Sequence, residues 1–284
     1  MTEIEKAGKT GFCFGVKRAL DILEKVAKER GGVETLGAVV HNEQVVQRLS
    51  KLGVITVKES ADIKGDTIVT SSHGVSPDLE ASLKKRRLKI ISTTCQNVQR
   101  AQKAAAKLVK EGFFVVVYGD ADHPEVKGIL GWAKDKSIAT TDVKDVAALS
   151  PRPLKIGILS QTTQVPEHFA AFVKKIIDLA LKKNSEIRVI DTICHDLRER
   201  QLAALELARR SDLMFVVGGQ HSANTNRIAE LCAKVTETRL IETAADIKKG
   251  WVRGKKHIGV TSGSSTAEET VQEVIQRLKE MARK

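Results

Sequence analysis

Three of the four cysteines, Cys13, Cys95 and Cys194, share a local sequence context that could place a thiolate in a metal site. In TGFCFGVKRAL, STTCQNVQRAQ and DTICHDLRERQ a short run ends in cysteine, an apolar residue follows three positions later, and a basic helix is predicted to begin. Each thiol is therefore expected where a loop enters a helix, whose dipole favours the thiolate form. Three such thiolates could hold zinc or an iron–sulfur cubane.

Three cysteines share this context, one fewer than a cubane cluster needs for a protein ligand on every iron. A cubane held by three cysteines leaves one iron without a protein ligand, and that iron can act as a Lewis acid toward a substrate oxygen. The residue types alone do not separate this site from a zinc site. Cys232 differs, because it is expected inside a helix beside Leu231 as a core residue. No two cysteines have the C-x2-C spacing of a zinc knuckle or a dithiol redox site.

Three histidines and one glutamate form a second set of candidates. His41, His73 and His123 each follow a predicted strand or the turn after it. Any one of them could instead be a structural histidine. Glu125, two residues after His123, could supply a proton if a closed site raised its pKa. The alternative for Glu125 is a carboxylate in the first turn of a helix, where it complements the dipole.

Three hydroxyl-rich turns follow strands and precede helices: Ser160–Gln164, Gly218–Asn226 and Thr261–Glu269. Residues of these types commonly cap helix N-termini. Backbone N–H groups and helix dipoles at such turns also suit a phosphate group. None of the three turns has the Walker A or G-x-G-x-x-G pattern, so no nucleotide is implied.

The elements that must position these residues alternate between short apolar strands and amphipathic helices, which predicts an α/β fold with mainly parallel sheets. We predict strands at Val33–Val40, Thr67–Ser71, Leu88–Thr93, Phe113–Tyr118, Lys155–Leu159, Ile187–Ile190, Leu213–Val217 and His257–Thr261. We predict helices at Val16–Lys28, Val98–Lys110, Pro166–Lys183, Leu197–Arg209 and Ala267–Lys284. The repeated cysteine context further predicts three similar lobes about a pseudo-threefold axis, with domains at 1–95, 96–193 and 194–284.

The amino-acid composition indicates which classes of partner the protein can bind. The chain has 284 residues, a formal net charge of +12 and only 4% aromatic residues. Scarce aromatics disfavour a nucleic-acid-binding protein, which needs surfaces for base stacking. The charge fits an anionic substrate, an acidic protein partner or an ordinary solvated surface. The sequence shows no secretory signal, and its longest strongly apolar run, Phe113–Tyr118, is too short to span a bilayer, so we expect a cytoplasmic protein with no membrane partner.

Nine motifs, in this order, resemble the LytB/IspH family of 4-hydroxy-3-methylbut-2-enyl diphosphate reductases. They run from Gly11 to Ser265 and are GFCFGVKRA, VVHN, SSHGVS, TTC, HPEV, SQTT, DTIC, HSANTNR and the Gly-x-Ser that ends at Ser265. The resemblance implies three α/β lobes around one [4Fe-4S] cluster per chain, ligated by Cys13, Cys95 and Cys194. It implies reductive dehydroxylation of the allylic diphosphate to isopentenyl and dimethylallyl diphosphates, the last step of the non-mevalonate isoprenoid pathway.

The resemblance also implies roles for individual side chains. Glu125 would deliver a proton to the leaving oxygen, aided by Thr162 and His123. The substrate contacts would come from His41, His73, His123, Thr162, Ser222, Asn224 and Ser265, with the diphosphate held by His41, His73, Ser222, Asn224 and Ser265. The electrons would come from a small acidic carrier, ferredoxin or flavodoxin.

The sequence departs from the family pattern at three positions near the diphosphate contacts. Ala223 stands where the family has a second serine, and Glu43 and Ala267 stand where prolines are common.

Two other interpretations of the sequence stay open at this point. One is quinolinate synthase, a three-lobed cluster enzyme with a carboxylic-acid substrate. The other is a zinc-stabilised, basic RNA-binding protein.

Overall fold

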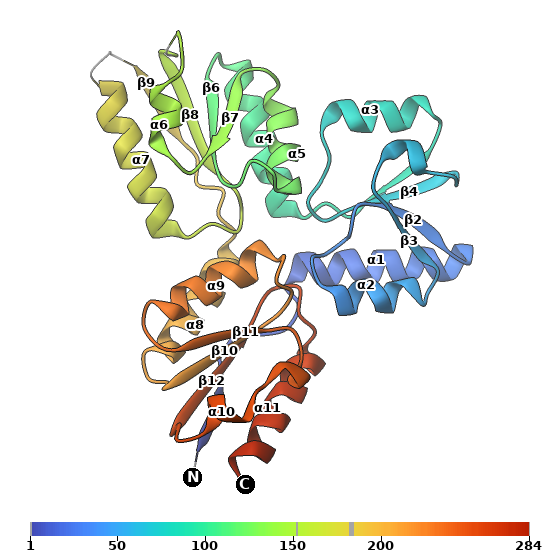
Figure 1. Cartoon of the computed structure of the whole chain (residues 1–284). Coiled ribbons are helices and arrows are strands. Elements are labelled where there is room, and N and C mark those ends of the chain that lie inside the picture. Colours follow the sequence, from blue (N-terminus) through green and yellow to red (C-terminus); the bar gives the residue numbers. More distant parts are fainter. Residues whose placement is uncertain (1, 152, 182–184, 284) are drawn as a thin grey trace. The chain divides into compact units, whose positions relative to one another are not determined.

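A computed structural model describes residues 2–151, 153–181 and 185–283 as three α/β lobes, each built on a four-stranded parallel sheet (Figure 1). This confirms the predicted fold class. We name the sheets A, B and C. Among the described residues no helix is both long and apolar enough to cross a membrane.

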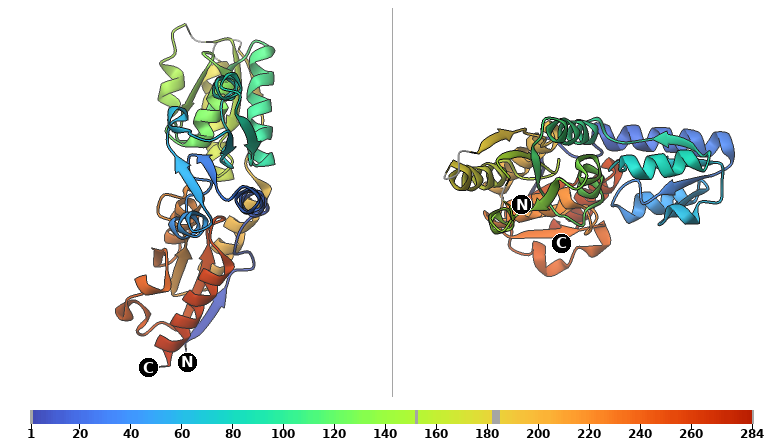
Figure 2. Two further views of the ribbon diagram at one scale, coloured as in Figure 1. Left: turned by 90° about the vertical axis from the view of Figure 1, so that its right-hand side faces the viewer. Right: turned by 90° about the horizontal axis from the view of Figure 1, so that it is seen from above.

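Sheet A has the strand order β1-β12-β10-β11, with all neighbours parallel. Its strands are β1 (Glu3–Lys6), β10 (Leu213–Val217), β11 (Thr238–Ile241) and β12 (His257–Ser262). The helices around it are α8 (His195–Ala208), α9 (Ala223–Ala233), α10 (Lys249–Val252) and α11 (Glu268–Ala282). Alternate residues of β10 point to opposite faces: Phe215 packs with the apolar side of α11, and Met214 packs with α8 and α9. Strand β1, the first of the chain, and helix α11, the last, both belong to this lobe (Figure 2).

Sheet B has the order β3-β2-β4-β5 and is also parallel. Its strands are β2 (Val33–Leu36), β3 (Val54–Val57), β4 (Thr67–Thr70) and β5 (Lys89–Ser92). The helices that alternate with these strands along the chain are α1 (Phe14–Arg30), α2 (Glu43–Ser50) and α3 (Pro77–Lys85).

Sheet C has the order β7-β6-β8-β9, again parallel throughout. Its strands are β6 (Phe114–Tyr118), β7 (Ser137–Thr140), β8 (Lys155–Ser160) and β9 (Glu186–Val189). Its helices are α4 (Gln96–Lys110), α5 (Pro124–Ala133), α6 (Val143–Ala147) and α7 (Pro166–Ala180). Val115 and Val117 face the core shared with α4 and α5, whereas Val116 faces the core shared with α6 and α7.

The chain divides into two compact units. Unit 1 comprises residues 1–17, 40–51 and 195–284 and contains sheet A; unit 2 comprises residues 18–39 and 52–194 and contains sheets B and C. The domain limits predicted at 95 and 193 stay a prediction. Strand β1 nevertheless pairs with β12, so the first strand of the chain belongs to the sheet of its last third.

All eight predicted strands are present, with ends shifted by up to a few residues. The largest shift is in Val33–Val40, where the strand stops at Leu36 because Gly37 turns the chain with a φ of +73°. Helix α7 ends at Ala180, earlier than predicted, and the predicted positions 182, 183 and 284 lie outside the described residues. The sequence prediction missed β1, β3, β7 and β11 together with several short helices.

Candidate functional site

The predicted site residues fall into two groups, one in each unit. Unit 2 holds His73, Cys95, His123, Glu125, Thr162 and Cys194. Unit 1 holds Cys13, His41, Ser222, Asn224 and Ser265.

Glu125 is a buried carboxyl group with two hydrogen bonds to one residue. Helix α5 begins with His123 as N-cap and Pro124 in its first turn, which leaves Glu125 in that turn and only 2% exposed. The Thr162 backbone N–H donates to Oε1 at 2.7 Å, and the Thr162 hydroxyl donates to Oε2 at 2.8 Å. Burial raises the pKa of Glu125, and the Thr162 bonds offset only part of that effect. The raised pKa favours the protonated form of Glu125, which suits a proton donor.

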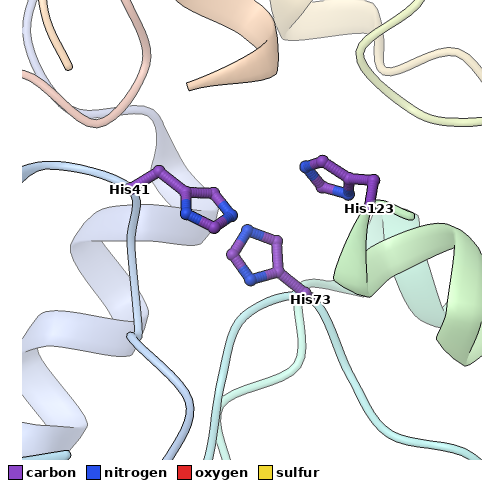
Figure 3. A group of neighbouring side chains, drawn as sticks. All are labelled: His41, His73 and His123. Carbon is purple, nitrogen blue, oxygen red and sulfur yellow. The ribbon is translucent and has the colours of Figure 1, made fainter. Parts of the chain in front are cut away.

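His123 is bound to the backbone of Glu125, and His73 packs against His123. The Nδ1 atom of His123 accepts a hydrogen bond from the Glu125 backbone N–H at 3.1 Å, which places the proton of a neutral imidazole on Nε2. The rings of His73 and His123 meet edge to face, with centroids 5.4 Å apart (Figure 3). His41, which Figure 3 also labels, belongs to unit 1.

Cys95 and Cys194 are each fixed by a backbone hydrogen bond to a loop that holds another candidate site residue. Cys95 is the N-cap of α4, and its N–H donates to the Ser72 carbonyl, next to His73, at 3.0 Å. Cys194 precedes α8, and its N–H donates to the Thr162 carbonyl at 2.9 Å. Thr162 thus contacts both the acid Glu125 and the candidate ligand Cys194.

Asn97 is a site residue that the sequence analysis missed. It lies in the first turn of α4, and its Nδ2 atom donates to the Cys194 sulfur at 3.1 Å. N–H bonds to sulfur tune thiolate ligands of metal clusters. An amide two residues after a candidate ligand in STTCQN was the available signal.

In unit 1 Cys13 lies at the start of α1, beside one of the hydroxyl-rich turns. The Cys13 N–H donates to the Ser264 carbonyl at 3.0 Å, and its sulfur accepts from the Val16 N–H at 3.4 Å. All three thiols therefore stand immediately before or at the N-terminus of a helix, as predicted. Cys232 is fully buried within α9, and burial raises its pKa to about 12, so it is a core residue, as expected.

The turns after β10 and β12 contain buried polar atoms that lack hydrogen-bond partners. Ser222 is the N-cap of α9, Asn224 is 2% exposed, and both polar atoms of the Asn224 amide and the Ser265 hydroxyl have no partner. A Cβ on Gly263 would overlap the Thr225 hydroxyl, so only glycine permits the two turns to approach this closely. Unpaired buried polar groups are costly, which points to a polar ligand at these turns.

His41 belongs to the same unit. Burial lowers the pKa of His41, and the charge of His221, the neighbour of Ser222, lowers it further. A neutral imidazole can still donate one N–H to an anion. Ala223, the position that departs from the family pattern, stands between the capping Ser222 and the buried Asn224.

The thiols fit a resident metal group on chemical grounds. The candidate donors are all sulfur, each stands at a helix N-terminus, and two of the sulfurs accept N–H hydrogen bonds. Thiolate ligands suit iron–sulfur clusters and zinc alike.

Comparisons with known proteins agree on one family. The model of the LytB protein family matches residues 4–279. A protein from Dehalococcoides mccartyi (strain CBDB1) is 55% identical over 272 residues, with 96% of each chain covered, and one from Geobacter metallireducens is 42% identical, with 98% of each covered. Both are named 4-hydroxy-3-methylbut-2-enyl diphosphate reductase.

Two solved structures of similarly named reductases also match. One, described as the terminal enzyme of the non-mevalonate pathway, is 37% identical with a TM-score of 0.71 and covers 99% of this chain and 100% of its own. The other, from Plasmodium falciparum, is 26% identical with a TM-score of 0.91 and covers 97% of this chain and 87% of its own.

Proposed function

Because this chain belongs to the LytB protein family, we propose that it is a 4-hydroxy-3-methylbut-2-enyl diphosphate reductase, an iron–sulfur oxidoreductase of isoprenoid biosynthesis. The observation that carries the proposal is the buried Glu125 carboxyl group, bound twice by Thr162, whose carbonyl in turn holds Cys194. A proton donor and a metal-ligating thiol are thus fixed by one residue. The match to the LytB model also leaves quinolinate synthase and a zinc-stabilised RNA-binding protein without support.

Cys13, Cys95 and Cys194 would hold the cluster. When bound, a [4Fe-4S] cluster with three cysteine ligands supplies electrons and one Lewis-acidic iron for the substrate's hydroxyl group. The reaction needs two electrons and two protons. The allylic C–O bond breaks, the hydroxyl leaves as water with one proton, and the allylic skeleton takes the other at either end. The two positions of that second proton give isopentenyl and dimethylallyl diphosphates.

Glu125 would donate the proton to the leaving oxygen. Its raised pKa keeps the proton available, and Thr162 fixes both carboxyl oxygens so that the acid stays oriented. His123 is tied to the Glu125 backbone and, with His73 and Thr162, would line the substrate on this side.

The diphosphate would bind to His41, Ser222, Asn224 and Ser265, with His73 as a further contact. The partnerless amide of Asn224 and hydroxyl of Ser265 supply the hydrogen-bond donors that phosphate oxygens require. A small acidic carrier, ferredoxin or flavodoxin, would deliver the electrons to this cytoplasmic enzyme.

The test is metal analysis and turnover of anaerobically purified protein. We expect about four irons with labile sulfide per chain, as a three-cysteine cubane requires. Reduction by dithionite with methyl viologen should convert the allylic diphosphate to the two products. Zinc in place of iron, or an iron-loaded protein without turnover, would contradict the proposed function.

A further inference from the structure

Helix α4 carries an unusually one-sided charge. Its sequence, QNVQRAQKAAAKLVK, contains four basic residues and no acidic one. Among the described residues, each of the other four helices of 14 or more residues contains at least two acidic side chains. Helix α4 therefore carries four positive charges that no acidic residue of the same helix offsets.

The four basic residues share the solvent face of α4. Arg100, Lys103, Lys107 and Lys110 are all exposed, at spacings that place them along one side of the helix. The opposite side packs Ala101, Ala105 and Leu108 into the core of sheet C. At about 1.5 Å of rise per residue, the basic face extends about 15 Å along the helix axis.

Local structure does not explain this arrangement. Like charges three or four residues apart destabilise a helix slightly. Arg100 and Lys103 are three residues apart, and Lys103 and Lys107 are four apart, so both pairs have this disadvantage. The acid next to this face is Glu111, which pairs with Lys107 at 3.9 Å and with Arg188. Arg100 donates to the Asp191 carbonyl at 2.7 Å, a bond that does not neutralise its charge.

One end of the basic face lies close to a candidate cluster ligand. Cys95 is the N-cap of α4, and Arg100 lies about 8 Å along the axis from it. Arg18 adds another positive charge at this end, since its guanidinium donates to the carbonyl of Thr94, the neighbour of Cys95, at 3.4 Å.

We propose that the face of α4 formed by Arg100, Lys103, Lys107 and Lys110 is the docking surface for an acidic one-electron carrier protein. This inference rests on the proposed function and adds the place where the electrons enter. Charge complementarity selects such a partner and accelerates encounter. Each encounter oxidises one carrier by one electron, so two encounters supply the two electrons of one turnover.

The test reverses two charges on α4 and two on a matched helix. Lys103→Glu with Lys107→Glu changes the proposed surface, whereas Lys174→Glu with Lys175→Glu changes exposed lysines on α7, which covers the other core of the same sheet. The probe is a plant-type [2Fe-2S] ferredoxin. Its affinity in the oxidised form is measured by biolayer interferometry at low and high salt, and reduced ferredoxin then drives turnover.

We expect the α4 variant to bind ferredoxin at least tenfold more weakly at low salt, with a similar loss in ferredoxin-driven kcat/KM. Turnover driven by dithionite and methyl viologen should stay within twofold of wild type, and the α7 variant should match wild type in every assay. Unchanged ferredoxin affinity, or equal losses in both variants, would overturn the proposal. Heparin serves as a polyanion that mimics nucleic acid. If the α4 variant lost heparin binding but kept ferredoxin binding, that result would overturn the proposal in favour of a nucleic-acid surface.

A milder variant covers the case in which charge reversal also impairs dithionite-driven turnover. Lys103→Gln with Lys107→Gln should keep that turnover and weaken ferredoxin binding by roughly threefold, and unchanged binding would again overturn the proposal. Failure of the proposed function gives a different result, because wild-type protein would then lack dithionite-driven turnover whatever its affinity for ferredoxin.

Discussion

Replacing Glu125 by glutamine separates its proposed role in proton donation from its structural role. Glutamine keeps the size of the side chain and an oxygen that can accept from the Thr162 N–H. The Thr162 hydroxyl, which donates to Glu125 Oε2, can rotate and accept from the new NH₂ group instead. We therefore expect Glu125→Gln to fold normally and keep both hydrogen bonds.

The expected loss is in the chemical step. A general acid contributes about 10²- to 10⁴-fold to a rate, so kcat should fall by that range while KM changes by less than about threefold. Steady-state assays with the allylic diphosphate as substrate and dithionite with methyl viologen as reductant measure both values. The matched control is Glu167→Gln, because Glu167 also follows a proline in the first turn of its helix, α7, but is exposed.

The same variant should change the pH dependence of stability. The pKa of Glu125 in the folded protein is raised, so its proton stabilises the fold fully below the unfolded pKa of about 4.3, and this contribution is lost as pH rises through the folded pKa. Glu125→Gln lacks this dependence and should gain stability relative to wild type toward neutral pH in urea titrations. Turnover within about threefold of wild type would refute the reasoning about Glu125.

Three further predictions concern the thiols and the turns. Cys13→Ser, Cys95→Ser and Cys194→Ser should each lose most of the iron and the brown colour, whereas Cys232→Ser should keep them; iron and sulfide analysis decides, and cluster loss from Cys232→Ser alone would contradict the assignment. Asn97→Ala removes an N–H donor to the Cys194 sulfur and should lower the reduction potential, with no change expected for the control Asn226→Ala. Asn224→Ala should raise KM for the diphosphate substrate about tenfold with kcat nearly unchanged, because the variant loses one charge-assisted contact to the substrate. A lowered kcat at constant KM would exclude a role for Asn224 in diphosphate binding alone.

The sequence predicted the central strands better than the edges of the sheets. Every strand that it missed, β1, β3, β7 and β11, lies at the edge of its sheet. Central strands such as β10 are buried on both faces and read as continuous apolar runs. An edge strand such as Thr238–Ile241 is half exposed and mixes polar with apolar residues, so no local pattern separates it from a loop.

In the candidate site too, the sequence predicted the features that depend on neighbouring residues and missed those that depend on contacts between distant segments. The position of each cysteine at the start of a helix follows from local sequence and was predicted. The bond from Asn97 to the Cys194 sulfur joins residues 97 positions apart, so the amide beside Cys95 in the sequence does not indicate which sulfur it binds. The raised pKa of Glu125 also depends on burial by distant segments, so the sequence supported only the chemical role and not the environment that permits it.

The spacing of the site residues along the chain follows from the parallel topology. In each sheet the residues of interest come after strands that are neighbours in the sheet. Strands β6 and β8 pair, which brings Glu125 to Thr162; β4 and β5 pair, which brings Ser72 to Cys95. Strands β10 and β12 pair, which brings the turn of Asn224 to the turn of Ser265.

This pairing explains why the motifs are scattered. Parallel neighbours need a crossover helix between them, so residues that meet at the carboxyl edge of a sheet must be separated by the length of that crossover. Each of the three sheets contributes such neighbouring loops, and the helix that follows a loop aims its N-terminus at the same edge. A thiolate and a diphosphate both gain from that position, because helix N-termini stabilise negative charge. One topology, used three times, therefore accounts for the placement of the candidate ligands, the anion-binding turns and the proton donor.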